Sequence, residues 1–388
     1  MARSWAARHD PGMNTDQCTP EQQRHPVALL VHPRTDVARD LGGVCRPLGW
    51  VPNAVYEGLM RRVRLPSAVT GTLRHADAPG FRAGWLITVP LTPSELLSGS
   101  RRVRDTIDRA VSRARDLGAR TVGLGALTAP ATAGGAALRH RPDIGITNGN
   151  AFTAAVTFQG VLRLLRQCAP DARVAVVGAS GSVGTPLTGL LARQTAQPLL
   201  LVGRNRKRLD ALAATLEPGR AQLSTTLDDL RRADVVVLLT SAADALLDSR
   251  HLKTGAIVLD DTQPRNTRPE LLLARPDVRI VDGGLVSVPG IVRRGYIGLP
   301  PGIAYACLAE TLLLGLAGHQ GHFALGTPSV GQAEHMLGLA HRFAHLGFTL
   351  APPHTFGQPV NLNRRFEDPL PTALPTDSAA SVAGTALA

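Results

Sequence analysis

A glycine-rich loop that directly follows a buried strand constrains this chain more than any other feature. Residues 173–177 read RVAVV, an apolar, β-branched run, and GASGSVG follows at 178–184. The next apolar run, PLLLV, begins at residue 198, which leaves room for a helix between the two strands. A strand, a glycine loop and a helix in this order predict a βαβ unit whose helix N-terminus binds a dinucleotide pyrophosphate.

The three glycines have separate roles in such a loop. Gly178 lets the chain leave the strand in a tight turn, Gly181 lets the pyrophosphate approach the backbone, and Gly184 lets the helix pack close to the sheet. The alternative is a glycine-rich turn without a ligand. We expect the residues between the glycines to contact the cofactor as well: Ser180, Ser182 and Val183.

The end of the second strand indicates which dinucleotide binds. An NAD site usually carries an acidic residue there, whereas this chain continues VGRNRKRL with Arg204 and then Asn205 at that place. Guanidinium groups suit a 2′-phosphate, so we predict NADP(H). The alternative is a charge run at the start of a solvated helix. Thr240 and Ser241, after the strand DVVVLLT, are expected to approach the cofactor at the carboxyl edge of the sheet.

Further apolar runs define the fold class. DVVVLLT at 234–240, AIVL at 256–259 and VRIV at 278–281 alternate with helical segments, which predicts a parallel sheet covered on both faces. Upstream, VALLV at 27–31, AGWLITV at 83–89 and TVGL at 121–124 accompany a helix expected over 93–117. The chain is therefore predicted to be an α/β protein, with a Rossmann-type doubly wound parallel sheet, an N-terminal α/β substrate domain and C-terminal helices that join them.

The expected organisation follows from these runs and from the composition of the two ends. Residues 1–26 are polar and aperiodic, and residues 352–388 are rich in Pro, Ala, Ser and Thr, so both are expected to be disordered tails. Between them we predict the substrate domain at 27–165, the NADP-binding domain at 166–300 and the C-terminal helices at 301–351.

Charge and cysteine content exclude several classes of function. The net charge is +12, but only two of the 42 basic residues are lysines, Lys207 and Lys253, and the arginines are not interleaved with aromatic residues. We therefore do not expect nucleic acid binding; genomic base composition explains the arginines, or they attract an acidic partner or a phosphorylated substrate. No apolar run is long enough to span a membrane, the first residues lack a secretory signal, and the four cysteines lack metal-ligand spacing. A cytoplasmic protein without a metal site is expected.

One cysteine lies where chemistry is expected. Pro300, Pro301 and Gly302 suit a helix start, and the segment ACLAETLLLGLAG at 306–318 is predicted to continue that helix. Cys307 would fall in an early turn of that helix, where the helix dipole can lower the pKa of a thiol. Because this segment lies just beyond the last strand of the sheet, Cys307 is our candidate nucleophile.

The order of several motifs resembles the long-chain fatty acyl-ACP reductases, which form aldehydes. TNGNAFTA at 147–154 is similar to T-T-G-N-T-H-T-A, and AVVGASGSVG to A-V-V-G-A-T-G-D-I-G. DDTQPRN at 260–266 resembles D-G-G-Y-P-K-N, VDGGLV at 281–286 resembles L-x-G-G-x-V, and ACLAETLLLGLAG is similar to A-C-F-A-E-A-M-L-L-E-F. AHRFAHLGFTL resembles the closing helix, so the resemblance covers about residues 27 to 350.

The resemblance implies covalent catalysis by Cys307, with Glu310 three residues on. The thiolate takes the acyl group from an acyl carrier protein or CoA thioester, and NADPH reduces the enzyme thioester to an aldehyde. An aldehyde-consuming enzyme is then a possible partner. The loop residues Asn148, Gly149, Asn150 and Thr153 are expected to line the substrate site, with ordinary turn chemistry as the alternative.

The chain also departs from the family motifs. Phe152, which we expect to line the substrate site, replaces a histidine, Ala129 replaces a serine, and Ser287 with Val288 replaces Glu-His. These changes concern proton transfer or the shape of the acyl site. Two other functions stay open. A dehydrogenase of the shikimate-dehydrogenase type would use a lysine, but no lysine precedes Lys207. The second is a non-catalytic sensor of NADPH, in which Cys307 only packs.

Overall fold

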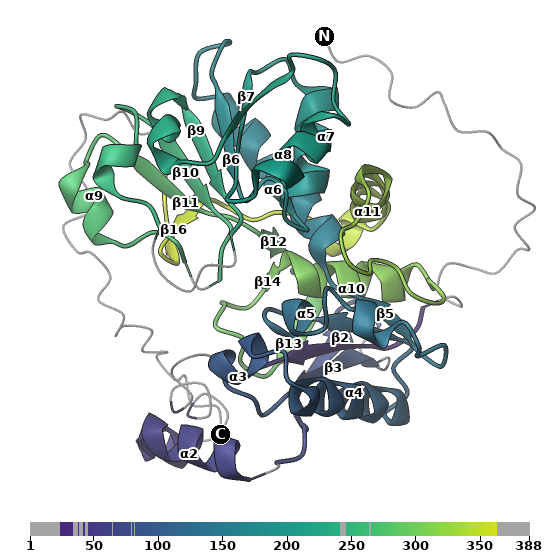
Figure 1. Cartoon of the computed structure of the whole chain (residues 1–388). Helices are drawn as coiled ribbons and strands as arrows, with labels where there is room; N and C mark the ends of the chain where they lie inside the picture. The colour runs from purple at the N-terminus through teal and green to yellow at the C-terminus, as the bar shows by residue number, and fades with distance from the viewer. Residues whose placement is uncertain are drawn as a thin grey trace, which may run out of the picture.

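The structure, a computed structural model, describes residues 24–33, 38, 42, 46–63, 65–78, 80, 82–240, 246–263 and 265–362. Two six-stranded sheets lie at opposite ends of this part of the chain, and helices fill the space between them (Figure 1). The predicted α/β fold class, with its Rossmann-type parallel sheet, is confirmed.

The sheet in the upper part of Figure 1 is the predicted dinucleotide-binding sheet. Its strand order is β11-β10-β9-β6-β7-β8, and every neighbouring pair is parallel. This is the doubly wound order, which reverses direction beside the first strand, β6. The strands are β6 (Val174–Val177), β7 (Leu199–Val202), β8 (Ala221–Ser224), β9 (Val235–Leu238), β10 (Ile257–Asp260) and β11 (Arg279–Asp282).

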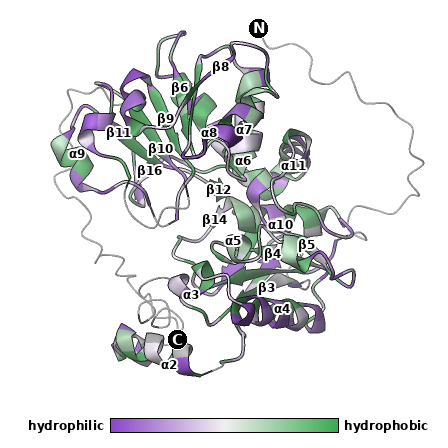
Figure 2. Cartoon of the chain, in the orientation of Figure 1, coloured by the Kyte–Doolittle hydropathy of each residue, from purple (hydrophilic) through white to green (hydrophobic). Residues whose placement is uncertain are grey.

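Helices cover both faces of this sheet because its strands are apolar at successive positions. Val174 and Val176 face one layer, and Ala175 and Val177 face the other. The continuous green strands in Figure 2 reflect this burial on two sides. The first layer contains α6 (Asn150–Leu165), α7 (Gly184–Gln194) and α8 (Arg206–Ala213); the second contains η3 (Leu227–Arg232), η4 (Ser249–His251) and α9 (Glu270–Ala274).

The other large sheet is mixed. Its order is β13-β2-β3-β1-β4-β5, with β3, β1, β4 and β5 parallel and with β2 and β13 antiparallel to their neighbours. The sequence predicted β1, β3 and β4 of this sheet but not β2, β5 or β13. The strands are β1 (Val27–Val31), β2 (Ala68–His75), β3 (Arg82–Thr88), β4 (Thr121–Leu124), β5 (Gly145–Thr147) and β13 (Ile291–Arg294).

Helices α4 (Arg101–Asp116) and α10 (Ala306–Leu316) pack on opposite faces of this mixed sheet. Along β1, Ala28 and Leu30 face α4, and Val27 and Leu29 face α10. The outer side of α4 is strongly hydrophilic (Figure 2). One long helix was expected over 93–117, but α3 (Pro93–Leu97) ends before α4 begins, since Gly99 has a φ of 58° and Ser100 caps the next helix.

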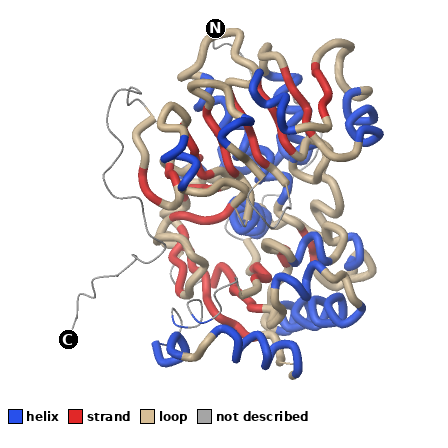
Figure 3. Tube along the Cα trace, turned by 60° about the vertical axis from the view of Figure 1, so that its left-hand side comes forward, coloured by secondary structure: helices blue, strands red, loops and turns tan. Residues whose placement is uncertain are grey.

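The remaining elements lie between and around the two sheets, and Figure 3 shows their strands in red. A three-stranded sheet, β14-β12-β15, and the pair β16–β17 lie among them. They are η1 (Arg46–Trp50), α2 (Asn53–Arg62), α5 (Thr128–Ala131), η2 (Ala136–Leu138), β12 (Leu285–Ser287), β14 (Ile303–Tyr305), α11 (Val330–Arg342), η5 (Ala344–Leu346), β15 (Thr349–Leu350), β16 (His354–Thr355) and β17 (Gln358–Pro359). None of the helices in the described ranges is long and apolar enough to cross a membrane.

The chain is more interwoven than the predicted boundaries at 165 and 300 imply. Strand β13 was assigned to the dinucleotide-binding domain, yet it pairs with β2 in the mixed sheet. The predicted C-terminal tail also begins too early: Phe356 and Gly357 donate backbone hydrogen bonds to Asp282, and Leu362 is buried. At the other end, His25 is buried and its backbone N–H donates to Gly315. The rest of both tails lies outside the described residues.

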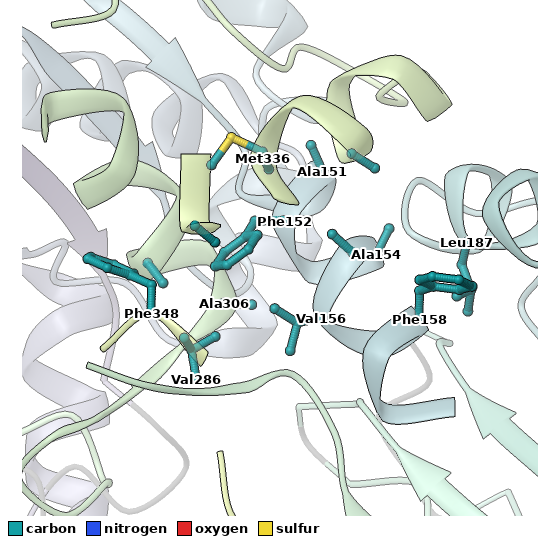
Figure 4. Close-up of a cluster of buried hydrophobic side chains, with 14 of the residues drawn as sticks. Ala151, Phe152, Ala154, Val156, Phe158, Leu187, Val286, Ala306, Met336 and Phe348 are labelled. Atoms are coloured by element: carbon teal, nitrogen blue, oxygen red, sulfur yellow. The ribbon is translucent and has the colours of Figure 1, made fainter. Parts of the chain in front are cut away.

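Helices α6, α10 and α11 form the core between the two sheets. Phe152 and Ala306 meet Met336 and Phe348 in one apolar cluster at this place (Figure 4). Since α6 enters the dinucleotide-binding layer while α10 packs on the mixed sheet, this cluster fixes one sheet relative to the other.

A glycine in β4 permits the close approach of α10. A Cβ atom on Gly123 would lie 2.0 Å from Oγ1 of Thr311, a fully buried side chain of α10. We expect Gly123→Ala to lower the free energy of unfolding by about 1–3 kcal/mol, because the helix must move outward. Urea denaturation measures this change. The matched control is Gly58→Ala in α2, where nothing lies within 4 Å of the new methyl group; an equal loss there would contradict the prediction.

Candidate active site

The glycine loop has the geometry of a dinucleotide-binding turn. Gly178 has a φ of 86°, and a Cβ on it would lie 2.8 Å from the carbonyl oxygen of Leu239. A Cβ on Gly184 would lie 2.3 Å from the carbonyl oxygen of Gly178, so α7 starts directly against the turn. A Cβ on Gly181 would lie 3.0 Å from the same oxygen. The half-buried residues Ser180, Ser182 and Val183 lie before the helix N-terminus, as an anion site requires.

The basic segment lies at the end of β7, as predicted. Residues 204–208 line an open hollow of about 690 Å³. Asn205 accepts a hydrogen bond from the backbone N–H of Arg208 at 3.1 Å and thereby caps α8, while Arg206 pairs with Asp210 at 2.9 Å. Arg204 is exposed, and in the described part of the chain no carboxylate forms a salt bridge with it. Its guanidinium is therefore available to a 2′-phosphate.

At the carboxyl edge of the sheet, Thr240 is half-buried directly after β9. Its hydroxyl donates to Oδ1 of Asn266, a fully buried side chain. Thr240 therefore lies where the sequence predicted, and its hydroxyl is part of the protein's own hydrogen-bond network. Ser241, its predicted companion, lies outside the described residues.

Cys307 occupies the first turn of α10, which begins at Ala306 after the short strand β14. The residue as a whole is half-buried. Burial raises the pKa of this thiol to about 11, although the backbone N–H groups of Leu308 and Ala126 oppose the rise and Glu310 adds to it. The expected lowering of the pKa by the helix dipole is therefore wrong, because desolvation outweighs it.

The loop at 147–150 lies directly on Cys307. A Cβ on Gly149 would lie 2.2 Å from the Cβ of Cys307, and Gly149 has a φ of 77°. Asn148 fixes this loop to two other segments, because its side-chain amide donates to the carbonyl oxygens of Gly134 and Gly326 at 2.9 and 2.8 Å. Only glycine combines this backbone conformation with this close contact.

The next residue connects the thiol to the cofactor loop. Asn150 is the first residue of α6, and its backbone N–H donates to Oδ1 of Asn148 at 3.0 Å. Its side-chain amide donates to Oγ of Ser182 at 3.0 Å. The structure thus brings the predicted residues Asn150 and Ser182 together, and the segment that contacts Cys307 also contacts the glycine loop.

Glu310 is buried one turn after Cys307, with no exposed surface. Its carboxylate accepts hydrogen bonds from the hydroxyl of Thr147 and from the backbone N–H of Phe152, the latter at 2.7 Å. Burial raises its pKa to about 7, and the hydrogen bonds at the start of α6 limit the rise. Glu310 therefore caps the N-terminus of α6 and holds the 147–150 loop over the thiol.

Two other residues of the predicted substrate site have structural roles. The ring of Phe152 is 2% exposed and packs in the apolar core of Figure 4, so it does not line an open site. Thr153 is half-buried, and its hydroxyl donates to the carbonyl oxygen of Gly149 at 2.8 Å. The prediction for Phe152 is wrong because its ring packs in this core cluster with Met336 of α11.

Sequence reasoning missed His32, which follows β1 at the carboxyl edge of the mixed sheet. Its Nε2 accepts from the backbone N–H of Leu127 at 3.2 Å, so its Nδ1–H donates to the carbonyl oxygen of Pro33 at 2.8 Å. The neighbouring Ala126 has a φ of 46°, rare for a residue with a side chain, and directs its N–H toward the Cys307 sulfur. A histidine directly after the strand VALLV was the available signal.

A small apolar pocket lies beside α10. Leu308 and Leu312 line it together with Leu73, Val288 and Ile291 from the mixed sheet and its connections. Its volume of about 10 Å³ is room for about one water molecule. In this conformation the pocket does not hold a long alkyl chain.

Comparisons with known proteins agree with the geometry. Residues 163–281, which contain the parallel sheet, match the family model described as shikimate / quinate 5-dehydrogenase. Aminotransferase PigE of Serratia sp. is 26% identical over 285 residues, which are 71% of this chain and 33% of that protein. Glutamyl-tRNA reductase of Caldivirga maquilingensis is 28% identical over 233 residues, which are 58% of this chain and 55% of that reductase. The chain spans about a third to a half of these curated relatives.

Among solved structures, glutamyl-tRNA reductase from Methanopyrus kandleri shares 22% identity over 47% of this chain and 47% of that chain, with a TM-score of 0.28. The family match covers the glycine loop and the basic segment alike. The parallel sheet therefore belongs to an NAD(P)-binding domain of the oxidoreductase type, and NADP(H) is the cofactor that its residues fit.

Arg204 is the residue that we expect to select NADPH over NADH. Arg204→Asp should lower the preference for NADPH by roughly 10- to 100-fold, because a charge-assisted hydrogen bond is lost and a carboxylate faces the 2′-phosphate. Fluorescence titration of both cofactors measures this ratio. Arg231→Asp, at an exposed arginine of η3, is the control; an unchanged ratio in Arg204→Asp would refute the assignment.

Gly149 should tolerate no side chain. Gly149→Ala combines a left-handed backbone with a methyl group that overlaps Cys307, and we expect it to lower the free energy of unfolding by about 2–4 kcal/mol. Denaturant unfolding gives the value, and the rate of Cys307 alkylation by iodoacetamide reports the local change. Gly338→Ala, in an open position of α11, should not lower the free energy of unfolding and should leave the alkylation rate unchanged. Wild-type stability of Gly149→Ala would contradict the close contact.

Proposed function

We propose that this protein reduces an acyl thioester to an aldehyde with NADPH, through a thioester on Cys307. The observation that carries the proposal is the 148–150 segment: Gly149 lies on Cys307 while Asn150 binds Ser182 of the glycine loop. One short segment therefore joins the thiol to the cofactor site. The motif resemblance to the long-chain fatty acyl-ACP reductases supports the same assignment.

The residues around Cys307 suit acyl transfer. The Cys307 thiol attacks the carbonyl carbon of the incoming thioester, and the leaving thiol takes away a proton, so one thioester replaces another without net charge change. The backbone N–H groups of Ala126 and Leu308, directed at the sulfur, would stabilise negative charge that develops beside it. Bound NADPH supplies the hydride that reduces the acyl group.

The names of the relatives support a reductase of activated acyl groups. Glutamyl-tRNA reductase is, by its name, an enzyme that reduces an aminoacyl group on tRNA, and this chain is 28% identical to one over 233 residues. An acyl carrier protein or CoA is the donor we propose for this chain. Similarity to an aminotransferase fits an aldehyde-consuming partner, since an aldehyde is a substrate for amine formation.

A second candidate is an NADP-dependent alcohol dehydrogenase, which the shikimate / quinate 5-dehydrogenase match favours. Such an enzyme needs an acid–base group at the substrate. The only two lysines of the sequence lie away from Cys307. Lys207 lines the hollow formed by residues 204–208, and Lys253 pairs with Asp234 at the opposite, amino edge of the sheet. The placement of the lysines therefore favours the thioester reductase.

Substitution of the thiol tests the proposal. With NADPH and a series of straight-chain acyl-CoA and acyl carrier protein thioesters, we expect wild type to oxidise NADPH and to release aldehyde. Cys307→Ala and Cys307→Ser should lose roughly 10³-fold or more of this activity, because no enzyme thioester forms.

Cofactor affinity is the control for this experiment, since both variants should bind NADPH like wild type. Cys168→Ala is the matched variant, because that free cysteine hydrogen-bonds to Leu164 within the dinucleotide-binding half. Aldehyde formation that survives in Cys307→Ala would exclude the covalent mechanism. Oxidation of a secondary alcohol by Cys307→Ala would instead favour the dehydrogenase, and NADPH binding without any turnover would favour a sensor.

A further inference from the structure

Asp261 is a carboxyl group at the ligand edge of the parallel sheet, directly after β10. It is half-buried. The hydroxyl of Thr157, from α6, donates to its Oδ2. The other oxygen lies against the Gly283–Gly284 turn: a Cβ on Gly284 would be 2.1 Å from Oδ1. The glycines after β11 thus leave space for this carboxyl group, which a side chain at Gly284 would displace.

The same glycine turn contacts the segment that carries the nucleophile. The carbonyl oxygen of Gly284 accepts a hydrogen bond from the backbone N–H of Ala306 at 2.9 Å. Cys307 is the next residue. Asp261 therefore contacts the turn that holds the residue before Cys307, at the edge where a doubly wound sheet binds its ligands.

The neighbouring carboxylates are committed to structure, which sets Asp261 apart. Asp260 accepts four hydrogen bonds, from the backbone N–H and hydroxyl groups of Thr262 and Thr267. Asp282 pairs with Arg265 at 2.8 Å and accepts two backbone N–H groups. Glu310 is fully buried at the start of α6. Among the described residues of this edge, Asp261 is the acidic residue that is not fully buried, and its carboxyl group has a single side-chain hydrogen-bond donor.

The surroundings also suit proton transfer near neutral pH. Burial raises the pKa of Asp261 to about 7, the Thr157 hydroxyl lowers it in part, and the Asp260 carboxylate adds to the rise. The glycine turn presents no charge to it. A general acid works best when its pKa lies near the working pH.

The geometry points to Asp261 as the general acid of the reduction step at Cys307. This inference rests on the proposed function and names the source of its proton. Asp261 stands where the motif D-G-G-Y-P-K-N has glycine, whereas Phe152 and Val288 stand where the family motifs have histidines. Relative to the family motifs, this chain therefore has one additional carboxyl group, at Asp261, and lacks two histidines.

Hydride from NADPH adds to the carbonyl carbon of RC(O)–S–Cys307 and gives RCH(O⁻)–S–Cys307. The C–S bond breaks, its electron pair leaves with the sulfur, and the C=O bond reforms. The proton of Asp261 passes to that sulfur, which yields the aldehyde, the Cys307 thiol, NADP⁺ and the Asp261 carboxylate; water then returns a proton to Asp261. Proton donation matters here because a thiol whose pKa is about 11 is a poor leaving group as a free thiolate.

A single-turnover experiment tests this role. The acyl-enzyme is first formed with octanoyl-CoA, confirmed by intact mass and freed from the donor, and then mixed with NADPH over pH 5.5 to 9, a range chosen to span roughly two units around the pKa. We expect wild-type aldehyde formation to fall as pH rises through about 7, since Asp261 loses its proton there. Asp261→Asn keeps the size and the Thr157 contact, and should form acyl-enzyme and bind NADPH normally but release aldehyde about 10²-fold more slowly, without that pH dependence.

Three further variants separate a proton donor from a structural residue. Asp261→Glu should restore part of the rate and the pH dependence. Thr157→Val removes the donor that lowers the pKa, so the midpoint should move to higher pH. Asp171→Asn, an exposed aspartate at the opposite edge of the same sheet, should behave as wild type. A wild-type rate and pH profile in Asp261→Asn would overturn the inference, whereas wild-type protein that forms no acyl-enzyme would overturn the proposed function itself.

Discussion

The buried carboxylate of Glu310 is the interaction on which the site depends. A carboxylate without exposed surface is costly unless donors surround it, and here the donors are the Thr147 hydroxyl and the N–H groups that begin α6. Because Glu310 belongs to α10 and its donors belong to the β5–α6 connection, the two helices cannot shift independently. The position of Gly149 on Cys307, and of Asn150 on Ser182, follows from this one contact.

A second constraint is that glycine occupies each place where two segments meet most closely. Gly178 and Gly184 shape the cofactor turn, Gly123 lets α10 approach the mixed sheet, and Gly149 lies on the thiol. At these positions any side chain would meet backbone or fully buried atoms. The site is therefore assembled by close backbone contacts, and its polar side chains mostly hold loops in place.

The sequence predicted the parallel sheet well because its strands are buried on both faces and its glycine loop has one physical explanation. Through a motif resemblance it assigned both Cys307 and the 148–150 segment to the active site, although it also assigned Phe152, whose ring packs in the core. It missed β2 and β13, whose exposed and mixed positions carry no clear period, and it missed His32, Ala126 and Asp261. Those three residues come close to the site only because the carboxyl ends of separate strands lie side by side in the fold, and no local sequence pattern predicts that proximity.

The pKa of Cys307 shows the same limit. From the sequence, a helix N-terminus predicts a more acidic thiol, but the amount of surrounding protein decides the outcome, and burial prevails. Charge placement was more predictable: the basic segment after β7 lies at an exposed strand end, where neighbouring residues alone determine what surrounds it.

The return of β13 to the mixed sheet has a consequence for how this chain can be divided. The polypeptide leaves that sheet through α6, builds the parallel sheet, and then comes back to supply an edge strand and the helix α10 that covers one face. No single cut between residues 150 and 290 yields two pieces that each keep a complete sheet and its cover. A fragment that ends after α6 would leave β2 as an unpaired edge and Val27 and Leu29 facing water, so we regard both halves as one cooperative folding unit.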